Sequence, residues 1–255
     1  MPAPIVIPAG ARYVALGSSF ASGPGIPAQF TACSRSDHNY PHLVAAALHL
    51  HLVDVTCSGA TTREILTLAQ HGYPPQISAV TTSTALVTIT IGGNNLQYST
   101  HLRLCALAQA TGGCLHTIDQ TKQQAIDDAL PNQLADVIAA VKQRAPLATI
   151  MVVTYPRIIP AGPPSCDRLS LVTADEAFLG NVGATLEQTL VQAAANAHVL
   201  LADPYVLGDG HGPCANDTAR WVEGLVPRSP DIEFHPNANG HAEMAALVEH
   251  ALTTA

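Results

Sequence analysis

The sequence predicts an α/β fold in which a central parallel sheet of about five strands lies between two layers of helices, a three-layer α/β/α sandwich. Short apolar runs alternate along the chain with longer stretches of helical composition, the pattern typical of β-α-β units. Runs such as ALVTITI at 85–91 and TIMVV at 149–153 are apolar almost throughout. Strands of that composition lie in parallel sheets that helices cover on both faces.

Each predicted strand is a short apolar run rich in residues that favour strands. These runs are 13–16, 51–56, 85–91, 149–154 and 199–202. The stretches of helical composition that separate or follow them predict helices at 39–49, 61–69, 119–144, 173–197 and 238–251. No repeat, low-complexity tract or linker interrupts this order, so we expect residues 1–255 to form a single domain.

The ends of the predicted strands are where functional residues are expected. In an open parallel sheet, ligands bind beyond the carboxyl ends of the strands. The Pro- and Gly-rich segments IIPAGPPSC at 158–166 and GDGHGPC at 208–214 predict long loops tied by cysteines. The residues that directly follow each apolar run are therefore the candidates for chemistry.

The composition describes a packed globular protein and excludes several classes of function. Apolar residues make up 47% of the chain and charged residues only 12%. Eleven Lys and Arg against nineteen Asp and Glu give a net charge of −8 without a basic stripe, so nucleic acid is not an expected partner. The longest apolar candidate, 43–53, is interrupted by His49 and His51, so no transmembrane segment is expected.

The cysteines are even in number and include no Cys-x-x-Cys pair, which predicts disulfide bonds rather than a zinc site. They are Cys33, Cys57, Cys105, Cys114, Cys166 and Cys214. The residues alone leave their pairing open. Disulfides imply an oxidising compartment, and the segment MPAPIVIPAG at 1–10 lacks the features of a secretory signal, so we expect the mature form of a secreted or otherwise extracytoplasmic protein. The alternative is a cytosolic protein with six buried thiols.

Four short blocks follow predicted strands or precede the last predicted helix. They are GSS at 17–19, CSGA at 57–60, GGNN at 92–95 and HPN at 235–237. Taken singly, Ser, Gly and Asn in such places are explained by helix caps and tight turns. Taken together and in this order, they supply a hydroxyl nucleophile, two groups of hydrogen-bond donors and an imidazole base, which are the parts of a serine hydrolase.

With these blocks the sequence resembles the SGNH (GDSL-type) hydrolase family over nearly the whole chain. The signature Ser, Gly, Asn and His of that family match Ser19, Gly59, Asn94 and His235. The similarity is greatest to the secreted actinobacterial esterases and lipases, in the stretches YVALG at 13–17, NYP at 39–41, IGGN at 91–94 and FHPN at 234–237. The resemblance implies the flavodoxin-like SGNH hydrolase fold and the hydrolysis of carboxylic esters.

The resemblance also implies roles and disulfide pairings. Ser19 would be the nucleophile and His235 its general base. The backbone N–H groups of Ser19 and Gly59 and the side-chain amide of Asn94 would form an oxyanion hole. The secreted relatives carry three disulfides, whose pairing in chain order implies Cys33–Cys57, Cys105–Cys114 and Cys166–Cys214.

The chain departs from the family pattern at two positions. Ser18 stands where the first block usually has Asp, so two adjacent serines are candidates, and the register of the motif selects Ser19. Ile232 stands where the triad Asp normally precedes the histidine. The orienting group must accept the Nδ1 proton of His235. Resemblance to relatives with a Ser-His dyad predicts the main-chain carbonyl of Ile232 in that role, and the alternative is Asp231.

The remaining histidines do not predict a metal site. His38 lies four residues from His42, and His49 two residues from His51, but no Glu lies in that region and the ligands are too few. We therefore predict that the protein uses no metal and no cofactor. His241 is expected to pack at the start of the last helix.

The composition predicts the class of substrate. Aromatic residues make up 4% of the chain, too few for a platform on which sugars stack, whereas the aliphatic content suits acyl chains. We therefore predict a small-molecule or lipid ester as substrate and a monomeric enzyme. Two alternatives stay open: an acyltransferase that uses the same acyl-enzyme, and a non-catalytic binding module descended from a hydrolase.

Overall fold

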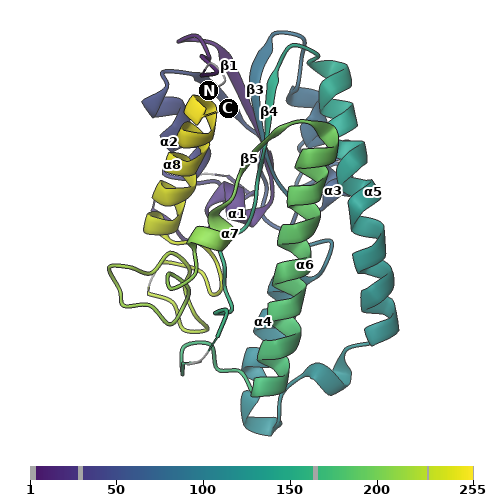
Figure 1. Ribbon diagram of the computed structural model, residues 1–255, viewed down its shortest axis with the longest axis vertical. Helices are drawn as coiled ribbons and strands as arrows, with labels where there is room; N and C mark the ends of the chain where they lie inside the picture. The colour runs from purple at the N-terminus through teal and green to yellow at the C-terminus, as the bar shows by residue number, and fades with distance from the viewer. Residues whose placement is uncertain (1–3, 28–30, 163–165, 229, 255) are drawn as a thin grey trace.

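The computed structural model describes residues 4–27, 31–162, 166–228 and 230–254 (Figure 1). A single parallel sheet runs through it in the strand order β2-β1-β3-β4-β5. Its strands are β1 (Arg12–Gly17), β2 (His51–Asp54), β3 (Thr84–Thr90), β4 (Thr149–Val153) and β5 (Leu200–Ala202). Each predicted strand is present, with its ends shifted by one or two residues at most.

Helices cover both faces of this sheet. α2 (Tyr40–Ala47) and α8 (Ala238–Thr254) pack together on one face, whereas α3 (Thr62–Leu66), α5 (Gln120–Arg144) and α6 (Thr173–Ala197) lie on the other (Figure 1). The predicted α/β/α sandwich is therefore confirmed.

The two layers exist because β1 sends alternate side chains into two apolar cores. Val14 and Leu16 pack on the side of α5 and α6, and Tyr13 and Ala15 pack on the side of α2 and α8. All four are completely buried, as expected for a strand in the middle of a covered parallel sheet. The Tyr13 hydroxyl keeps a hydrogen bond, 2.7 Å long, to the Thr88 hydroxyl.

Among the described residues, three further α-helices lie where the sequence predicted none: α1 (Ser19–Ser22), α4 (Tyr98–Leu107) and α7 (Pro204–Leu207). Short 3-10 helices occur as well, at Gln76–Ala79, Gln109–Thr111 and Leu115–Thr117. α1 and α7 are single turns that directly follow strands. Before α4, Gln97 has a φ of 55° and its side chain makes no capping hydrogen bond. α4 therefore begins without the Ser, Thr, Asp or Asn that marks a helix start in a sequence.

Three disulfide bonds join the cysteines in the order of the chain: Cys33–Cys57, Cys105–Cys114 and Cys166–Cys214. The first ties the loop before α2 to the segment after β2, and the second closes the end of α4. The third joins the loop after β4 to the loop after β5. This is the pairing that the resemblance implied, and the first and third bonds hold loops that leave the carboxyl ends of strands.

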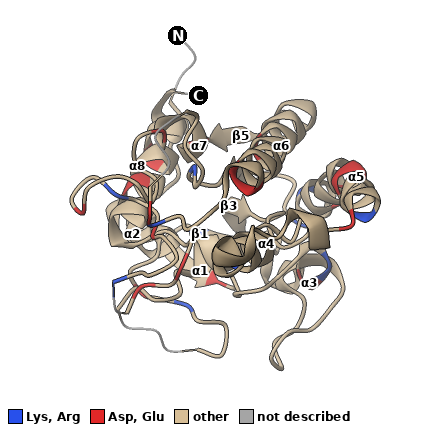
Figure 2. Ribbon diagram, turned by 90° about the horizontal axis from the view of Figure 1, so that it is seen from below, with Lys and Arg blue, Asp and Glu red and all other residues tan. Residues whose placement is uncertain are grey.

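Charged side chains are few and dispersed. Figure 2 shows the Lys and Arg residues on separate loops and helices rather than gathered on one element. Within the residues that the structure describes, no helix is long and apolar enough to cross a membrane.

Candidate active site

The blocks singled out in the sequence meet at one end of the sheet. β1 lies between β2 and β3, and all three strands run parallel. The segments 18–22, 57–60 and 92–97, which follow these strands, therefore lie at the same carboxyl end. His235 comes from the segment before α8, and its Nε2 lies 2.8 Å from the Oγ of Ser19.

Ser19 sits in a tight connection between β1 and α1. A Cβ atom at Gly17 would lie 2.7 Å from the backbone oxygen of Thr90, so only glycine fits at the end of β1. The side-chain amide of Gln76 accepts from the N–H of Gly17 at 2.8 Å and donates to its carbonyl at 2.9 Å. Gln76 thereby holds both main-chain polar groups of Gly17, two residues before Ser19.

Ser18 points to a different partner. Its hydroxyl lies 3.3 Å from the hydroxyl of Tyr155, which also accepts a hydrogen bond from the N–H of Gly93 at 3.0 Å. Of the two adjacent serines, only Ser19 contacts the imidazole of His235. Tyr155 was missed from the sequence, although it stands just past the carboxyl end of β4, where functional residues are expected.

The group that orients His235 is the main-chain carbonyl of Glu233, 2.8 Å from Nδ1. The prediction of the Ile232 carbonyl is wrong, because that carbonyl accepts the backbone N–H of His235 itself, at 3.3 Å, within a tight turn. Phe234 takes a φ of 55° in this turn, which places the next carbonyl, that of Glu233, beside the imidazole. The alternative, Asp231, does not hold Nδ1 here either, because the hydrogen bond that the described residues make with Nδ1 comes from the Glu233 carbonyl.

This contact fixes the tautomer of the imidazole. A carbonyl oxygen can only accept, so Nδ1 carries the proton and Nε2 faces Ser19 as a base. Burial lowers the pKa of His235, while the Glu233 carbonyl and the Glu233 carboxylate oppose that shift. The imidazole therefore stays neutral, and able to take a proton, to a lower pH than an ordinary histidine.

Three groups expected to donate to the substrate oxygen lie on the segments that follow β1, β2 and β3: the backbone N–H groups of Ser19 and Gly59 and the side-chain amide of Asn94. Within the described part of the chain, no group accepts a hydrogen bond from the backbone N–H of Ser19 or of Gly59. Gly59 is exposed and has a φ of 82°, a conformation that favours glycine. The amide of Asn94 gives one N–H to the carbonyl of Ala60 at 2.9 Å and retains its second.

A buried ion pair holds the segment that carries His235. The backbone N–H of Glu223 donates to the carbonyl of His235 at 3.0 Å, and the Glu223 carboxylate accepts from the amide of Asn237 at 2.8 Å. Arg220 pairs with this carboxylate at 3.1 Å, and both side chains are buried. Asn237 in turn caps α8 by accepting the N–H of Gly240. Nothing in the sequence marked Arg220 or Glu223, because both lie in an irregular segment.

His241 has a structural role. His241 is buried at the start of α8, as predicted, and its Nδ1 accepts the N–H of Tyr40 at 3.1 Å. Burial, followed by the nearby His235, lowers the pKa of His241 to about 3, so it is neutral.

Within the described residues, one group of side chains has its potential ligand atoms close enough together to hold a metal ion: Cys105, Cys114 and Asp175. The two sulfurs of this group are joined in a disulfide.

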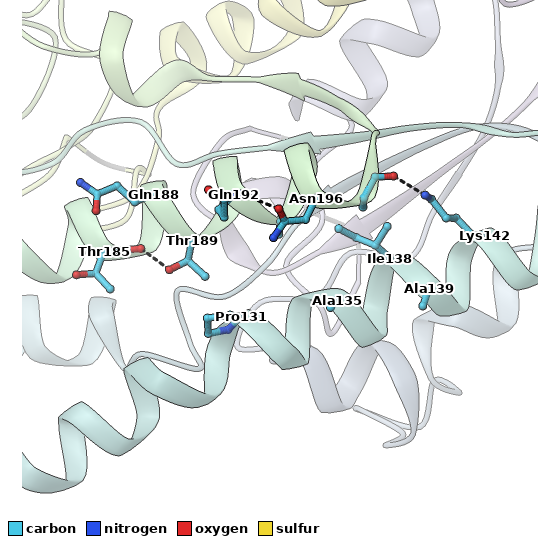
Figure 3. Close-up of a pocket in the computed structure, with 12 residues that line it drawn as sticks. Pro131, Ala135, Ile138, Ala139, Lys142, Thr185, Gln188, Thr189, Gln192 and Asn196 are labelled. Atoms are coloured by element: carbon cyan, nitrogen blue, oxygen red, sulfur yellow. Dashed lines mark hydrogen bonds between the residues drawn. The ribbon is translucent and has the colours of Figure 1, made fainter.

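A groove of about 500 Å³ lies elsewhere, between α5 and α6 (Figure 3). Its lining is mostly apolar and amide side chains, among them Pro131, Ile138 and Gln188. The ammonium group of Lys142 lies at one end, where it donates to the carbonyl of Ala197. None of the blocks that meet at the carboxyl end of the sheet contributes to this groove.

Comparison with known proteins agrees with this geometry. Residues 15–243 match the model of the GDSL-like lipase/acylhydrolase family. The chain is 34% identical to Lipase 2 of Streptomyces coelicolor, over 94% of this chain and 84% of that protein. Among solved structures, the extracellular lipase of Streptomyces rimosus has a TM-score of 0.80 and 30% identity, covering 94% of this chain and 99% of that one. Phospholipase A1 of Streptomyces albidoflavus has a TM-score of 0.81 and 26% identity, covering 95% and 100%. Because the matched stretch takes in all of the blocks at the carboxyl end of the sheet, the chain belongs to the GDSL-like lipase/acylhydrolase family.

Proposed function

We propose that Ser19 and His235 carry out the ester hydrolysis that the family of this chain performs. The observation that carries the proposal is the 2.8 Å contact between Ser19 Oγ and His235 Nε2, on an imidazole whose proton is held at Nδ1 by the Glu233 carbonyl. A serine hydroxyl is a weak nucleophile until an adjacent base removes its proton. The geometry supplies that base in the correct tautomer.

In the proposed cycle, the Oγ of Ser19 attacks the carbonyl carbon of an ester while Nε2 of His235 takes the hydroxyl proton. The resulting tetrahedral intermediate collapses, and the imidazolium gives its proton to the leaving alcohol. The acyl group is then bound to Ser19. A water molecule attacks this acyl-enzyme, His235 takes the proton of the water, and collapse releases the carboxylic acid and restores Ser19.

The negative charge on the substrate oxygen would be met by the N–H groups of Ser19 and Gly59 and the free N–H of Asn94. Such donors stabilise the transition state because they are fixed before charge develops and need no reorganisation. Their lack of other acceptors among the described residues supports this role.

The orienting carbonyl makes the site a dyad rather than a carboxylate triad. A carbonyl fixes the tautomer and the direction of the ring, as a carboxylate would, but places less negative charge beside the imidazolium. The charge that acts on the ring is that of the Glu233 carboxylate, which pairs with Arg103 at 3.0 Å. That carboxylate raises the pKa of His235 against the effect of burial.

The substrates are proposed to be aliphatic acyl esters, lipid esters among them. The names of the relatives, lipases and a phospholipase A1, support this class. The scarcity of aromatic side chains argues in the same direction. Three disulfides and the similarity to an extracellular lipase support a place outside the cytoplasm.

Covalent labelling tests the proposal. A fluorophosphonate is expected to inactivate the hydrolysis of p-nitrophenyl butyrate in step with the attachment of one label per chain, which peptide mass spectrometry places on Ser19. The reagent mimics the tetrahedral intermediate and needs an activated serine. Heat-denatured protein serves as the control and should not react. A label on another residue, or full activity after labelling, would overturn the assignment.

The pH dependence tests the charge beside the imidazole. Glu233→Gln removes a carboxylate that raises the pKa of His235, so the neutral form should persist to lower pH. The acidic limb of the kcat/KM profile is therefore expected to move to lower pH, with kcat on the plateau changed by no more than about twofold. Glu243→Gln, at an exposed position of α8, removes the same charge from a carboxylate that does not contribute to the pKa shift of His235, and should leave the profile in place. A shift to higher pH in Glu233→Gln would contradict the assigned contact.

A further inference from the structure

We infer that Gln70 is a positioning residue that aims the N–H of Gly59 at the substrate oxygen. The inference rests on the proposed function, in which Gly59 is an oxyanion donor. Its starting point is a hydrogen bond of 2.8 Å from the side-chain amide of Gln70 to the main-chain carbonyl of Ser58. That carbonyl and the Gly59 N–H belong to the same peptide unit.

The geometry of the peptide unit couples the direction of the Ser58 carbonyl to that of the Gly59 N–H. A trans peptide is planar, and its C=O and N–H bonds point in opposite directions. Holding the oxygen of Ser58 on one side therefore sets the direction of the N–H of Gly59 on the other. Among the described residues, Gln70 alone donates a hydrogen bond to the Ser58 carbonyl. Without it, this peptide could rotate about the line that joins its two Cα atoms.

The flanking residues restrain the segment but leave this rotation open. The N–H of Ser58 donates to the carbonyl of Cys33 at 3.0 Å, and the Ser58 hydroxyl lies 3.0 Å from that of Ser22. Gly59 has no side chain, and an added Cβ would meet only the Gln70 amide, at 3.6 Å. Because glycine tolerates many backbone conformations, the direction of its N–H depends on outside contacts.

Gln70 is itself held rigidly. Its N–H and carbonyl form a pair of hydrogen bonds with Tyr73, 3.0 and 2.9 Å long, which close a tight hairpin. His71 and Gly72 at the tip have φ values of 51° and 81°, as a two-residue hairpin turn requires. The guanidinium of Arg35 lies over the Tyr73 ring, 5.0 Å from its centroid. The Gln70 backbone therefore provides a fixed base for its side chain.

Within the described ranges, the bond to Ser58 is the one hydrogen bond that this side chain makes. Its Oε1 is buried without a hydrogen-bond partner among the described residues, and Gln70 is one of the residues that line a cavity of about 350 Å³. Since a carbonyl can only accept, the amide nitrogen must face Ser58. A substitution at Gln70 therefore acts on the Ser58–Gly59 peptide and on no other described hydrogen bond of the side chain.

The test replaces the donor while keeping the size of the side chain. In Gln70→Glu an acceptor faces the Ser58 carbonyl, and in Gln70→Met no polar group does. Both variants are expected to lose about tenfold or more in kcat, less than the roughly 10²–10³-fold loss expected for Asn94→Ala, which removes a donor outright. KM should change by no more than about twofold, because the lost contact acts on the transition state.

Affinity for a transition-state analogue separates this role from a general loss of structure. An alkylboronic acid forms a tetrahedral adduct with a serine oxygen, so its affinity should fall by the same factor as kcat/KM. Gln188→Glu is the matched control, because it makes the same chemical change at an exposed position of α6 (Figure 3) and should leave both quantities at wild-type values. Circular dichroism at the assay temperature gives the folded fraction of each variant.

The outcomes are distinct. Wild-type kcat and boronate affinity in the two Gln70 variants would overturn the inference, as would a loss of activity that only follows the loss of folded protein. A wild-type protein that fluorophosphonate does not label at Ser19 would instead overturn the proposed function, whatever the Gln70 variants do. Labelled and active wild-type protein with unaffected Gln70 variants would leave the function standing and remove only the role of Gln70.

Discussion

Ser19→Ala is expected to reduce ester hydrolysis to the uncatalysed background, a loss on the order of 10⁴–10⁶-fold in kcat. The reason is that the Oγ of Ser19 is the atom that the imidazole contacts, at 2.8 Å, and no acyl-enzyme can form without it. Release of p-nitrophenol from p-nitrophenyl butyrate at a pH near 8 measures the loss. Binding of the ester should persist, since alanine removes a single oxygen.

Ser18→Ala is the natural control for that experiment. The Ser18 hydroxyl is buried and lies against the Tyr155 hydroxyl, so its removal should cost a modest amount of stability and leave most of the activity. If Ser19→Ala retained activity while Ser18→Ala lost it, the nucleophile would be Ser18, and the register of the motif would be wrong for this chain.

His235→Ala is expected to produce the second largest loss, at least about 10⁴-fold in kcat. Without the imidazole, no other described side chain hydrogen-bonds to the Ser19 hydroxyl to take its proton or to return a proton to the leaving alcohol. The same assay, carried out from pH 5 to 10, should show residual activity that rises with pH, because hydroxide then replaces the missing base. The fluorophosphonate should react far more slowly with this variant than with wild-type protein.

Asp231→Asn separates a dyad from a triad. Nδ1 of His235 contacts the Glu233 carbonyl, so a change at Asp231 should alter kcat by no more than about twofold. In a carboxylate triad, loss of the acid costs several orders of magnitude. If Asp231→Asn approached the loss seen in His235→Ala, a triad would have to form on substrate binding.

The ion pair of Arg220 and Glu223 shows why a dyad can still be well organised. Burying two charges costs several kcal/mol of desolvation, and their mutual attraction only roughly offsets this, so the pair is weak evidence for stability. The backbone N–H of Glu223 donates to the carbonyl of His235, and the paired Glu223 carboxylate accepts from the side-chain amide of Asn237. Glu223 thus holds the main chain at His235 and the side chain of Asn237 just after it, and the imidazole needs only one carbonyl to complete its orientation.

The sheet could be predicted because its signal is local. Runs such as 85–91 and 149–153 are rich in residues that favour strands, they are buried almost throughout, and they are found as β3 and β4. α4 could not be predicted, because its first turn has no cap and its place depends on the contacts that Tyr98 and Leu102 make in the core. The apolar pattern within one segment predicts whether that segment is buried. The formation of a helix without a cap depends instead on the side chains that pack against it.

The sequence by itself determined the class of the fold, the residues of the four blocks and the identity of the family. The tertiary structure alone decided which carbonyl orients His235 and what aims the Gly59 N–H. Every residue carries a main-chain carbonyl, so the choice of Glu233 over Ile232 depends on a turn in which Phe234 has positive φ. Gln70 and Ser58 lie twelve residues apart, and no local pattern reports their contact. The sequence states which side chains are present. The direction of a backbone N–H or C=O group depends on dihedral angles and on contacts with distant residues, which only the folded chain defines.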